Sequence, residues 1–240
     1  MKVRNLYFLD EEKRAKLIIQ SLEKEKVKFV VCPFNIKGYL GQNILVTQWT
    51  DFSKPYIVIS AHYDGYGAYD NLGGTVVLFW MIKWMKRILK TGNYLFAFFD
   101  GEERGLLGSN AFLKHFCAKS KTIRTHLSLD GFGIGDSIGC FANLDRVFLK
   151  VNGKGYNMPL QADTIVFQKN DIPSLHCFSL PYKELKALVK ENIFPTTWYI
   201  LHTKEDSPKH VEEIWLPLFA WQLMCKLDTL EFDTKGIISL

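Results

Sequence analysis

The chain has 240 residues, 48% of them hydrophobic, and a formal net charge of +5 at pH 7. These numbers allow a large apolar core. They are compatible with one α/β domain over residues 1–240, because no repeat or low-complexity linker interrupts the chain. The charge excess lies mainly on predicted helix faces, with Lys83, Lys86 and Lys90 as examples. Solvated helix faces account for it, so we expect no nucleic-acid partner.

The cysteines and the apolar segments bear on where the protein works. Five cysteines, an odd number without a CxxC pair, favour reduced thiols and a cytoplasmic location. The first 26 residues carry charges throughout and lack the apolar segment of a signal peptide. The most apolar predicted helix meets Lys83 after seven residues, far short of the roughly 20 that span a bilayer. We therefore expect a soluble protein with no membrane partner.

The first half of the chain alternates between helical and extended patterns. Its predicted elements are a helix over 10–25, strands over 27–32, 43–49 and 56–61, a helix over 75–89, a strand over 94–99 and a helix over 106–116. The strand at 56–61 is a continuous apolar run, which is typical of a strand buried on both faces.

The second half continues the alternation. Its predicted elements are strands over 125–129, 138–142, 147–151 and 175–180, a helix over 181–192, a last strand over 197–201 and a closing helix over 212–227. Residues 152–173 form the loop-rich part of the prediction, in which one helix is the alternative to continuous loop.

Polar side chains that suit a divalent metal follow four of the predicted strands. They are His62 with Asp70, Glu102 with Glu103, Asp130, and His202. Parallel strands bring their C-terminal ends to one edge of a sheet, so these residues are expected to converge there. Two histidines and several carboxylates suit zinc or a related ion, and they suffice for two ions that share a bridging carboxylate. Each feature alone has an ordinary explanation, such as a turn or a solvated pair. Their joint occurrence favours a metal site.

Four segments around these residues also resemble a known family. AHYDGYGAYDNLGG (61–74), FFDGEERGLLGS (98–109), LSLDGFG (127–133) and LHTKEDS (201–207) look like the metal-site motifs of the co-catalytic dizinc aminopeptidases. These are of the bacterial leucyl-aminopeptidase type, related to glutamate carboxypeptidase and glutaminyl cyclase. The resemblance implies a three-layer α/β fold, with a mixed, mostly parallel sheet between helices on both faces.

The resemblance also implies a role for each matched residue. His62 and Asp130 would bind one metal, Glu103 and His202 the other, and Asp70 would bridge them. The ions would be zinc, with cobalt or manganese as alternatives. Glu102 would be the general base, and Asp64 would orient the imidazole of His62. In this family the peptide bond after the bridging aspartate is often cis, which makes Asp70–Asn71 a candidate. The chain departs from the family at Gly73, where many members have serine.

Several other residues are candidates for supporting roles. Asp100 is expected to cap the turn before Glu102, and Asp206 to steady the loop of His202. Tyr199 is a candidate oxyanion donor, although core packing explains it equally well. Phe132 and Phe141 are candidates for a specificity pocket. We expect His126 to be a buried polar residue rather than a ligand.

The implied function is a zinc-dependent aminopeptidase that acts on peptides through a metal-bridged water, with Glu102 as general base. Two alternatives stay open at this stage. One is a glutaminyl-peptide cyclase with a single zinc, and the other is a metal-binding relative without catalysis. The sequence does not distinguish oligomeric states or side-chain preferences.

Overall fold

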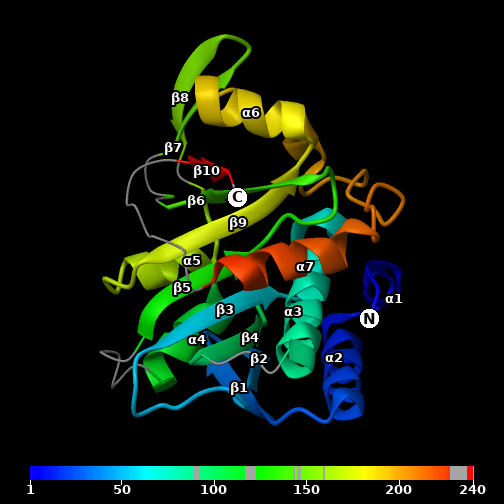
Figure 1. Cartoon of the computed structure of the whole chain (residues 1–240), viewed down its shortest axis with the longest axis vertical. Helices are drawn as coiled ribbons and strands as arrows, with labels where there is room; N and C mark the ends of the chain where they lie inside the picture. Colours follow the sequence, from blue (N-terminus) through cyan, green and yellow to red (C-terminus); the bar gives the residue numbers. More distant parts are fainter. Residues whose placement is uncertain are drawn as a thin grey trace.

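The computed structural model describes residues 1–88, 92–116, 123–142, 144, 147–158, 160–227 and 237–239. An eight-stranded mixed sheet in the order β1-β2-β4-β3-β5-β9-β6-β10 runs through it (Figure 1). The four central strands, β4, β3, β5 and β9, are parallel, and the strands on both sides of them pair antiparallel. The predicted α/β fold with a mixed sheet and a parallel centre is confirmed.

The sheet strands are β1 (Phe29–Ile36), β2 (Tyr39–Val46), β3 (Tyr56–His62), β4 (Tyr94–Phe99), β5 (Ile123–Leu129), β6 (Ser137–Phe141), β9 (Ser174–Leu180) and β10 (Ile237–Ser239). A separate hairpin consists of β7 (Val147–Val151) and β8 (Lys154–Met158). The helices are α1 (Val3–Tyr7), α2 (Glu11–Glu25), α3 (Gly74–Ile88), α4 (Leu107–Phe116), α5 (Asp163–Gln168), α6 (Tyr182–Glu191) and α7 (Trp215–Lys226), with the shorter turns η1 (Ala68–Gly73) and η3 (Thr196–Ile200).

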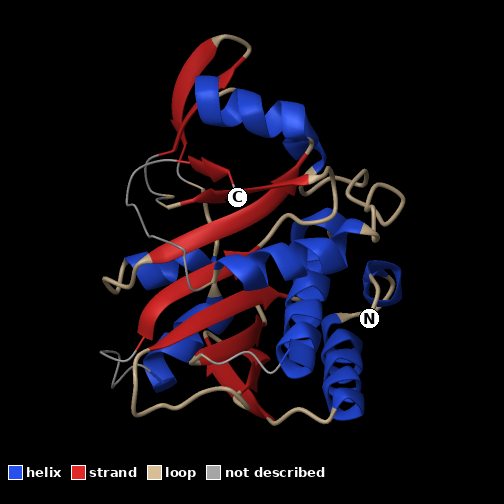
Figure 2. Cartoon of the chain, viewed as in Figure 1, coloured by secondary structure: helices blue, strands red, loops and turns tan. Residues whose placement is uncertain are grey.

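Helices cover both faces of the sheet, as Figure 2 shows. Successive side chains of a strand point to opposite faces. In β3, Ile57 and Ile59 pack into a core with α2, α3 and α7, whereas Tyr56 and Val58 pack into a second core with α4 and α5. Burial on both sides explains why β3 and β4 are apolar at nearly every position. The three-layer arrangement is therefore confirmed.

Most predicted elements agree with the structure to within a few residues, but the strand predicted over 197–201 is wrong. These residues form the tight turn η3, with Trp198 N–H donating to the carbonyl of Pro195 and Leu201 N–H to that of Trp198. The ring of Trp198 lies 5.3 Å from that of Phe178. The large apolar side chains favour a strand, but here they pack onto the sheet rather than pairing with it. The end of the helix predicted at Leu89 lies outside the described residues.

The prediction of reduced thiols is also wrong. Cys140 in β6 and Cys177 in β9 form a disulfide, with the two Cα atoms 4.1 Å apart. The two residues lie directly opposite in the antiparallel register, although 37 positions separate them in sequence. Spacing alone does not reveal such a pair. Cys32 and Cys225 are free, and Cys117 lies outside the described residues. The cysteine pattern therefore no longer supports a cytoplasmic location, which stays a prediction.

Among the helices of the described ranges, none has the combination of length and apolar character that crossing a bilayer requires.

Candidate metal centre

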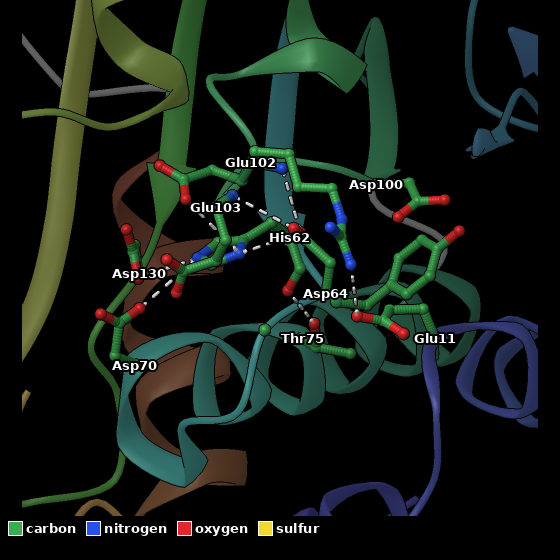
Figure 3. A network of polar contacts seen from close by, with 12 residues as sticks. Glu11, His62, Asp64, Asp70, Thr75, Asp100, Glu102, Glu103 and Asp130 are labelled. Atoms are coloured by element: carbon green, nitrogen blue, oxygen red, sulfur yellow. Dashed lines mark hydrogen bonds and ion pairs between the residues drawn. The ribbon is translucent and has the colours of Figure 1, made fainter. Parts of the chain in front are cut away.

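Three of the predicted ligand segments follow neighbouring parallel strands. β3 ends at His62, β4 leads into Glu102 and Glu103, and β5 is followed directly by Asp130. Because these strands are parallel, their C-terminal ends lie at the same edge of the sheet, and Figure 3 shows the side chains pointing toward one another. The convergence predicted for these three strand ends is found.

Asp70 lies between two groups of potential ligands. Its Oδ1 is 3.5 Å from Nε2 of His62, and that same nitrogen is 3.4 Å from Oδ1 of Asp130. Its Oδ2 is 3.5 Å from Nε2 of His202. In each of the two groups, His62–Asp70–Asp130 and Asp70–Glu103–His202, the candidate ligand atoms lie within 4.8 Å of one another. The structure thus places Asp70 where a shared carboxylate would have to be.

His202 reaches the site from a loop rather than from a strand. It follows η3 and adopts a left-handed conformation, with φ of 57°. Its Nδ1 is 3.7 Å from Oε2 of Glu103, and its side chain is 67% exposed. His62 is buried by contrast. One group is therefore enclosed, and the other opens toward solvent.

Asp64 connects His62 to the turn that carries Glu102 and Glu103, which we call the glutamate turn. Its buried carboxylate lies 3.3 Å from Nδ1 of His62, and it accepts hydrogen bonds from the backbone N–H groups of Glu102 and Glu103, both at 3.1 Å. Because Nδ1 faces Asp64, Nε2 is left to face Asp70 and Asp130. The carboxylate of Glu102 lies 3.9 Å from Nδ1 of His62 and contributes to neither ligand group.

The electrostatics of the site favour a cation. Burial, together with the charge of Asp130, raises the pKa of Asp70 to about 7. Burial likewise raises the pKa of Glu102 well above its ordinary value. Burial lowers the pKa of His62, but the carboxylates of Glu102 and Asp130 outweigh it and raise the value overall. Carboxylates gathered in a buried position repel one another, and a divalent ion relieves this repulsion. Imidazole and carboxylate donors also match the preferences of zinc.

Asp206 fixes the segment that carries Asp70. One oxygen of its buried carboxylate accepts the backbone N–H groups of Ala68 (2.9 Å) and Tyr69 (2.6 Å), and the other accepts that of Asp70 (3.0 Å). We expected Asp206 to steady the loop of His202. It also ties that loop to η1, so the two segments that carry Asp70 and His202 are held together.

The predicted cis bond between Asp70 and Asn71 is not found, since no peptide bond in the described ranges is cis. Asn71 instead takes a φ of 127°, and it lies at the kink inside η1, shortly before α3 begins. Asparagine tolerates positive φ better than most side chains do. Asn71 is fully buried, and neither polar atom of its amide has a hydrogen-bond partner within the described structure.

Comparison with known protein families identifies the family of this chain. The model of peptidase family M28 matches residues 43–217, which include all the ligand candidates. The chain belongs to peptidase family M28. Among curated relatives, it is 28% identical over 235 residues to a vacuolar membrane protease of Candida albicans, which covers 92% of this chain and 26% of that protein. It is 30% identical over 193 residues to a vacuolar membrane protease of Ajellomyces dermatitidis, which covers 70% of this chain and 18% of that protein. The chain thus spans about a quarter or less of these relatives.

Solved structures share the M28 fold. The zinc aminopeptidase BSAP from Bacillus subtilis superposes with a TM-score of 0.59 and 21% identity, over 83% of this chain and 53% of that one. The glutaminyl cyclase of Porphyromonas gingivalis superposes with a TM-score of 0.65 and 14% identity, over 92% and 90%. At these identities the likeness establishes the fold.

Packing explains why this M28 chain has glycine at position 73. A Cβ atom there would overlap the carbonyl oxygen of Phe132, in the segment that follows β5. The serine that many family members carry would not fit without displacing that backbone. Thr75 then donates to the carbonyl of His62 at 2.6 Å, which fastens the start of α3 to the end of β3.

Two buried residues of the site were not predicted. Arg14 of α2 donates from Nη1 to the carbonyls of Tyr63 (2.9 Å) and Gly65 (2.6 Å), on either side of Asp64. In the sequence Arg14 belongs to an ordinary charged helix pattern, so no signal marks it. Asp163 begins α5, is almost fully buried, and has its pKa raised to about 7 by burial. Its charge contributes to the raised pKa of Glu102. It lies in 152–173, for which the sequence predicts loops with one helix as an alternative, and α5 is that helix.

The other residues predicted to support the site have different surroundings. Asp100 accepts hydrogen bonds from the hydroxyl of Tyr39 (2.8 Å) and from Gln42 N–H, so it ties the glutamate turn to β2. His126 is buried, as predicted, and its Nε2 lies 2.8 Å from the hydroxyl of Ser60. Tyr199 is 57% exposed and packs against Phe194, and it borders neither of the two cavities described next.

Two cavities meet at the site, and both are bordered by Asp70 and His202. The smaller, about 250 Å³, is lined mainly by apolar side chains: Tyr69, Leu160, Phe178, Trp198 and Leu201. Phe132 and Phe141, the predicted pocket residues, are buried in the core and do not border it. The larger cavity, about 570 Å³, is bordered mainly by residues with polar or charged side chains, which include Arg104 and Lys204.

Proposed function

We propose that this M28 chain is a zinc-dependent aminopeptidase that removes the N-terminal residue of peptides. The observation that carries the proposal is the sharing of Asp70 between two complete ligand groups, with the carboxylate of Glu102 beside them. His62 and Asp130 would hold one ion, Glu103 and His202 the other, and Asp70 both.

The protein groups around the ions would divide the work of hydrolysis. When bound, two divalent ions polarise the scissile carbonyl and lower the pKa of water from about 15.7 toward about 7. Glu102 takes the proton from the attacking water and returns it to the leaving amine. Asp64 orients His62 and also holds the backbone of Glu102, so it sets the distance between base and ligand.

The smaller cavity supports a preference for an apolar N-terminal residue. Its apolar lining is adjacent to Asp70 and Asp130, and its volume of about 250 Å³ is slightly below the roughly 300 Å³ at which pockets for drug-sized ligands begin. A single large apolar side chain would bury its surface there, which is worth about 1.5–3 kcal/mol. We therefore expect leucine and phenylalanine to be released faster than glycine or glutamate.

Replacement of Glu102 tests the proposal. Glu102→Gln keeps the size of the side chain and removes its ability to take up a proton, so turnover of leucine amide should fall by a factor of at least about 100. Zinc content, measured by atomic absorption, should stay at the wild-type value because Glu102 belongs to neither ligand group. As a control, Glu205→Gln removes an exposed carboxylate that pairs with Lys209, and it should not change turnover. Comparable turnover in Glu102→Gln and wild type would contradict the role of Glu102.

Glutaminyl cyclisation is the second candidate, because the chain covers 90% of the Porphyromonas gingivalis cyclase but only 53% of BSAP. Metal stoichiometry distinguishes the two activities. One zinc per chain together with cyclisation of N-terminal glutamine would favour the cyclase, and two per chain with release of free amino acids would favour the peptidase. Zinc binding without turnover of either substrate class would favour a non-catalytic relative.

A further inference from the structure

The larger cavity contains two cationic side chains next to the candidate metal centre. Arg104 directly follows Glu103, and Lys204 lies two residues after His202, so each cation is carried by a segment that also carries a ligand candidate. The glutamate turn that carries Arg104 also carries Glu102. Because Glu102 is proposed to protonate the leaving amine, the part of the substrate behind the scissile bond would lie on this side.

Most carboxylates that border the cavity are engaged elsewhere. Asp64 accepts two backbone N–H groups of the glutamate turn, and Asp206 accepts three of η1. Asp70 and Glu103 belong to the ligand groups. The remaining carboxylate, Glu11, lies 3.7 Å from Nη2 of Arg104. Of the carboxylates that border the cavity, Glu11 alone pairs with one of the two cations.

Arg104 is positioned to receive a ligand. Its guanidinium lies over the ring of Tyr39, 5.0 Å from the ring centre, and its side chain is 53% exposed. One of its nitrogens, Nη2, faces Glu11, and the exposed guanidinium can also bind a ligand carboxylate through paired N–H groups. Lys204 is exposed and forms no ion pair with any described residue. A volume of about 570 Å³ is within the range of ligand pockets.

We propose that Arg104 and Lys204 form a subsite for a carboxylate on the leaving-group side of the scissile bond. This inference rests on the proposed peptidase function. The carboxylate comes either from the C-terminus of a short peptide or from an acidic side chain at the second residue. In the first case the preferred substrates are dipeptides, and in the second they are peptides with glutamate or aspartate after the cleaved bond.

Four substrates distinguish these sources with the zinc-loaded protein. Leu-Ala is compared with Leu-Ala amide, and Leu-Glu amide with Leu-Gln amide, each as kcat/KM. A C-terminal subsite predicts that kcat/KM is about tenfold higher for Leu-Ala than for Leu-Ala amide. Leu-Glu amide and Leu-Gln amide should then have equal kcat/KM. A side-chain subsite predicts that Leu-Glu amide exceeds Leu-Gln amide by about tenfold, since a charge-assisted hydrogen bond is worth roughly 1.4 kcal/mol or more.

Variants assign the preference to the two cations. In the double variant Arg104→Gln/Lys204→Gln, the ratio of the two kcat/KM values within the pair that shows the preference should fall to about one. The change should come mainly from KM. In Arg104→Glu it should fall below one. The ratio is measured within one preparation, so a general loss of activity does not affect it. Lys209→Gln, which changes an exposed lysine outside the cavity, should keep the wild-type ratio.

Two results would overturn the subsite. The first is equal kcat/KM within both substrate pairs in the wild type, and the second is a preference that survives in the double variant. If none of the four substrates were cleaved, the proposed peptidase function would fail, and this inference with it. Cleavage of all four without preference would remove only the subsite.

Discussion

Asp206 shows how one carboxylate can organise a site without touching an ion. Its two oxygens accept hydrogen bonds from the three successive backbone N–H groups of Ala68, Tyr69 and Asp70 in η1. Asp206→Asn would turn an amide NH₂ toward at least one of these donors. We expect zinc affinity to fall by a factor of about 10–100, the usual effect of losing such a supporting contact. Competition with a chelating dye measures it, and Glu205→Gln is the matched control. Unchanged affinity would show that η1 holds its shape without Asp206.

His126 makes stability depend on pH at a position away from the ligand groups. It is buried, stacked on Phe167 at 3.6 Å, and burial lowers its pKa well below the ordinary 6.5. Below about pH 6.5 the unfolded chain protonates this imidazole and the folded chain does not. The free energy of unfolding should therefore decrease as the pH falls, by up to about 1.4 kcal/mol per pH unit for one group.

Urea unfolding of metal-stripped protein between pH 7.5 and 5.5 measures this dependence. His126→Asn should show a slope that is shallower by about 1 kcal/mol per pH unit. His210→Gln, at an exposed position, should keep the wild-type slope. An identical slope in His126→Asn would mean that other groups account for the acid sensitivity.

At the scale of elements, the disulfide joins two strands beside the site. The backbone carbonyl of Cys177 also accepts a hydrogen bond from the backbone N–H of Asp130 at 2.9 Å, so the crosslinked strand β9 supports a ligand candidate. A crosslink across 37 positions restricts the unfolded chain by an amount worth about 2–4 kcal/mol. Cys140→Ala/Cys177→Ala should lose that much in the free energy of unfolding. Cys225→Ser, which changes an exposed free cysteine, should lose almost none. Equal stability of the double variant and wild type would contradict this role.

The elements also show what a sequence can predict. Continuous apolar runs predicted β3 and β4, which are buried on both faces, and helical periodicity predicted α3. The parallel strand ends then located His62, Glu103 and Asp130. The stretch at 197–201 has the same apolar composition as a strand, yet it packs as a turn. The pairing of Cys140 with Cys177 and the reach of Arg14 depend on tertiary register, which no local pattern contains. The roles of the site residues stay predictions until variants are measured.

For the whole molecule, metal content is the decisive quantity. Stripped protein should take up two zinc ions per chain and become more stable, by about 2.7 kcal/mol for each bound ion when free zinc is 100 times the dissociation constant of that site. His202→Ala removes a ligand from one group only, so it should retain one ion, whereas Asp70→Ala should weaken both sites. Atomic absorption after dialysis measures these ratios. Two ions retained in His202→Ala would show that the exposed histidine is not a ligand.

The family match begins at residue 43, but the contacts of Arg14 extend the working unit further toward the N-terminus. A shortened protein that starts at residue 43 would leave the carbonyls of Tyr63 and Gly65 without this buried donor. It would also uncover the apolar residues of α3 against which α2 packs. Its central strands could still assemble, but the turn that orients His62 would lose its outer support. Anyone trimming this protein to its metal-site segments should therefore keep α2, which contacts them from outside.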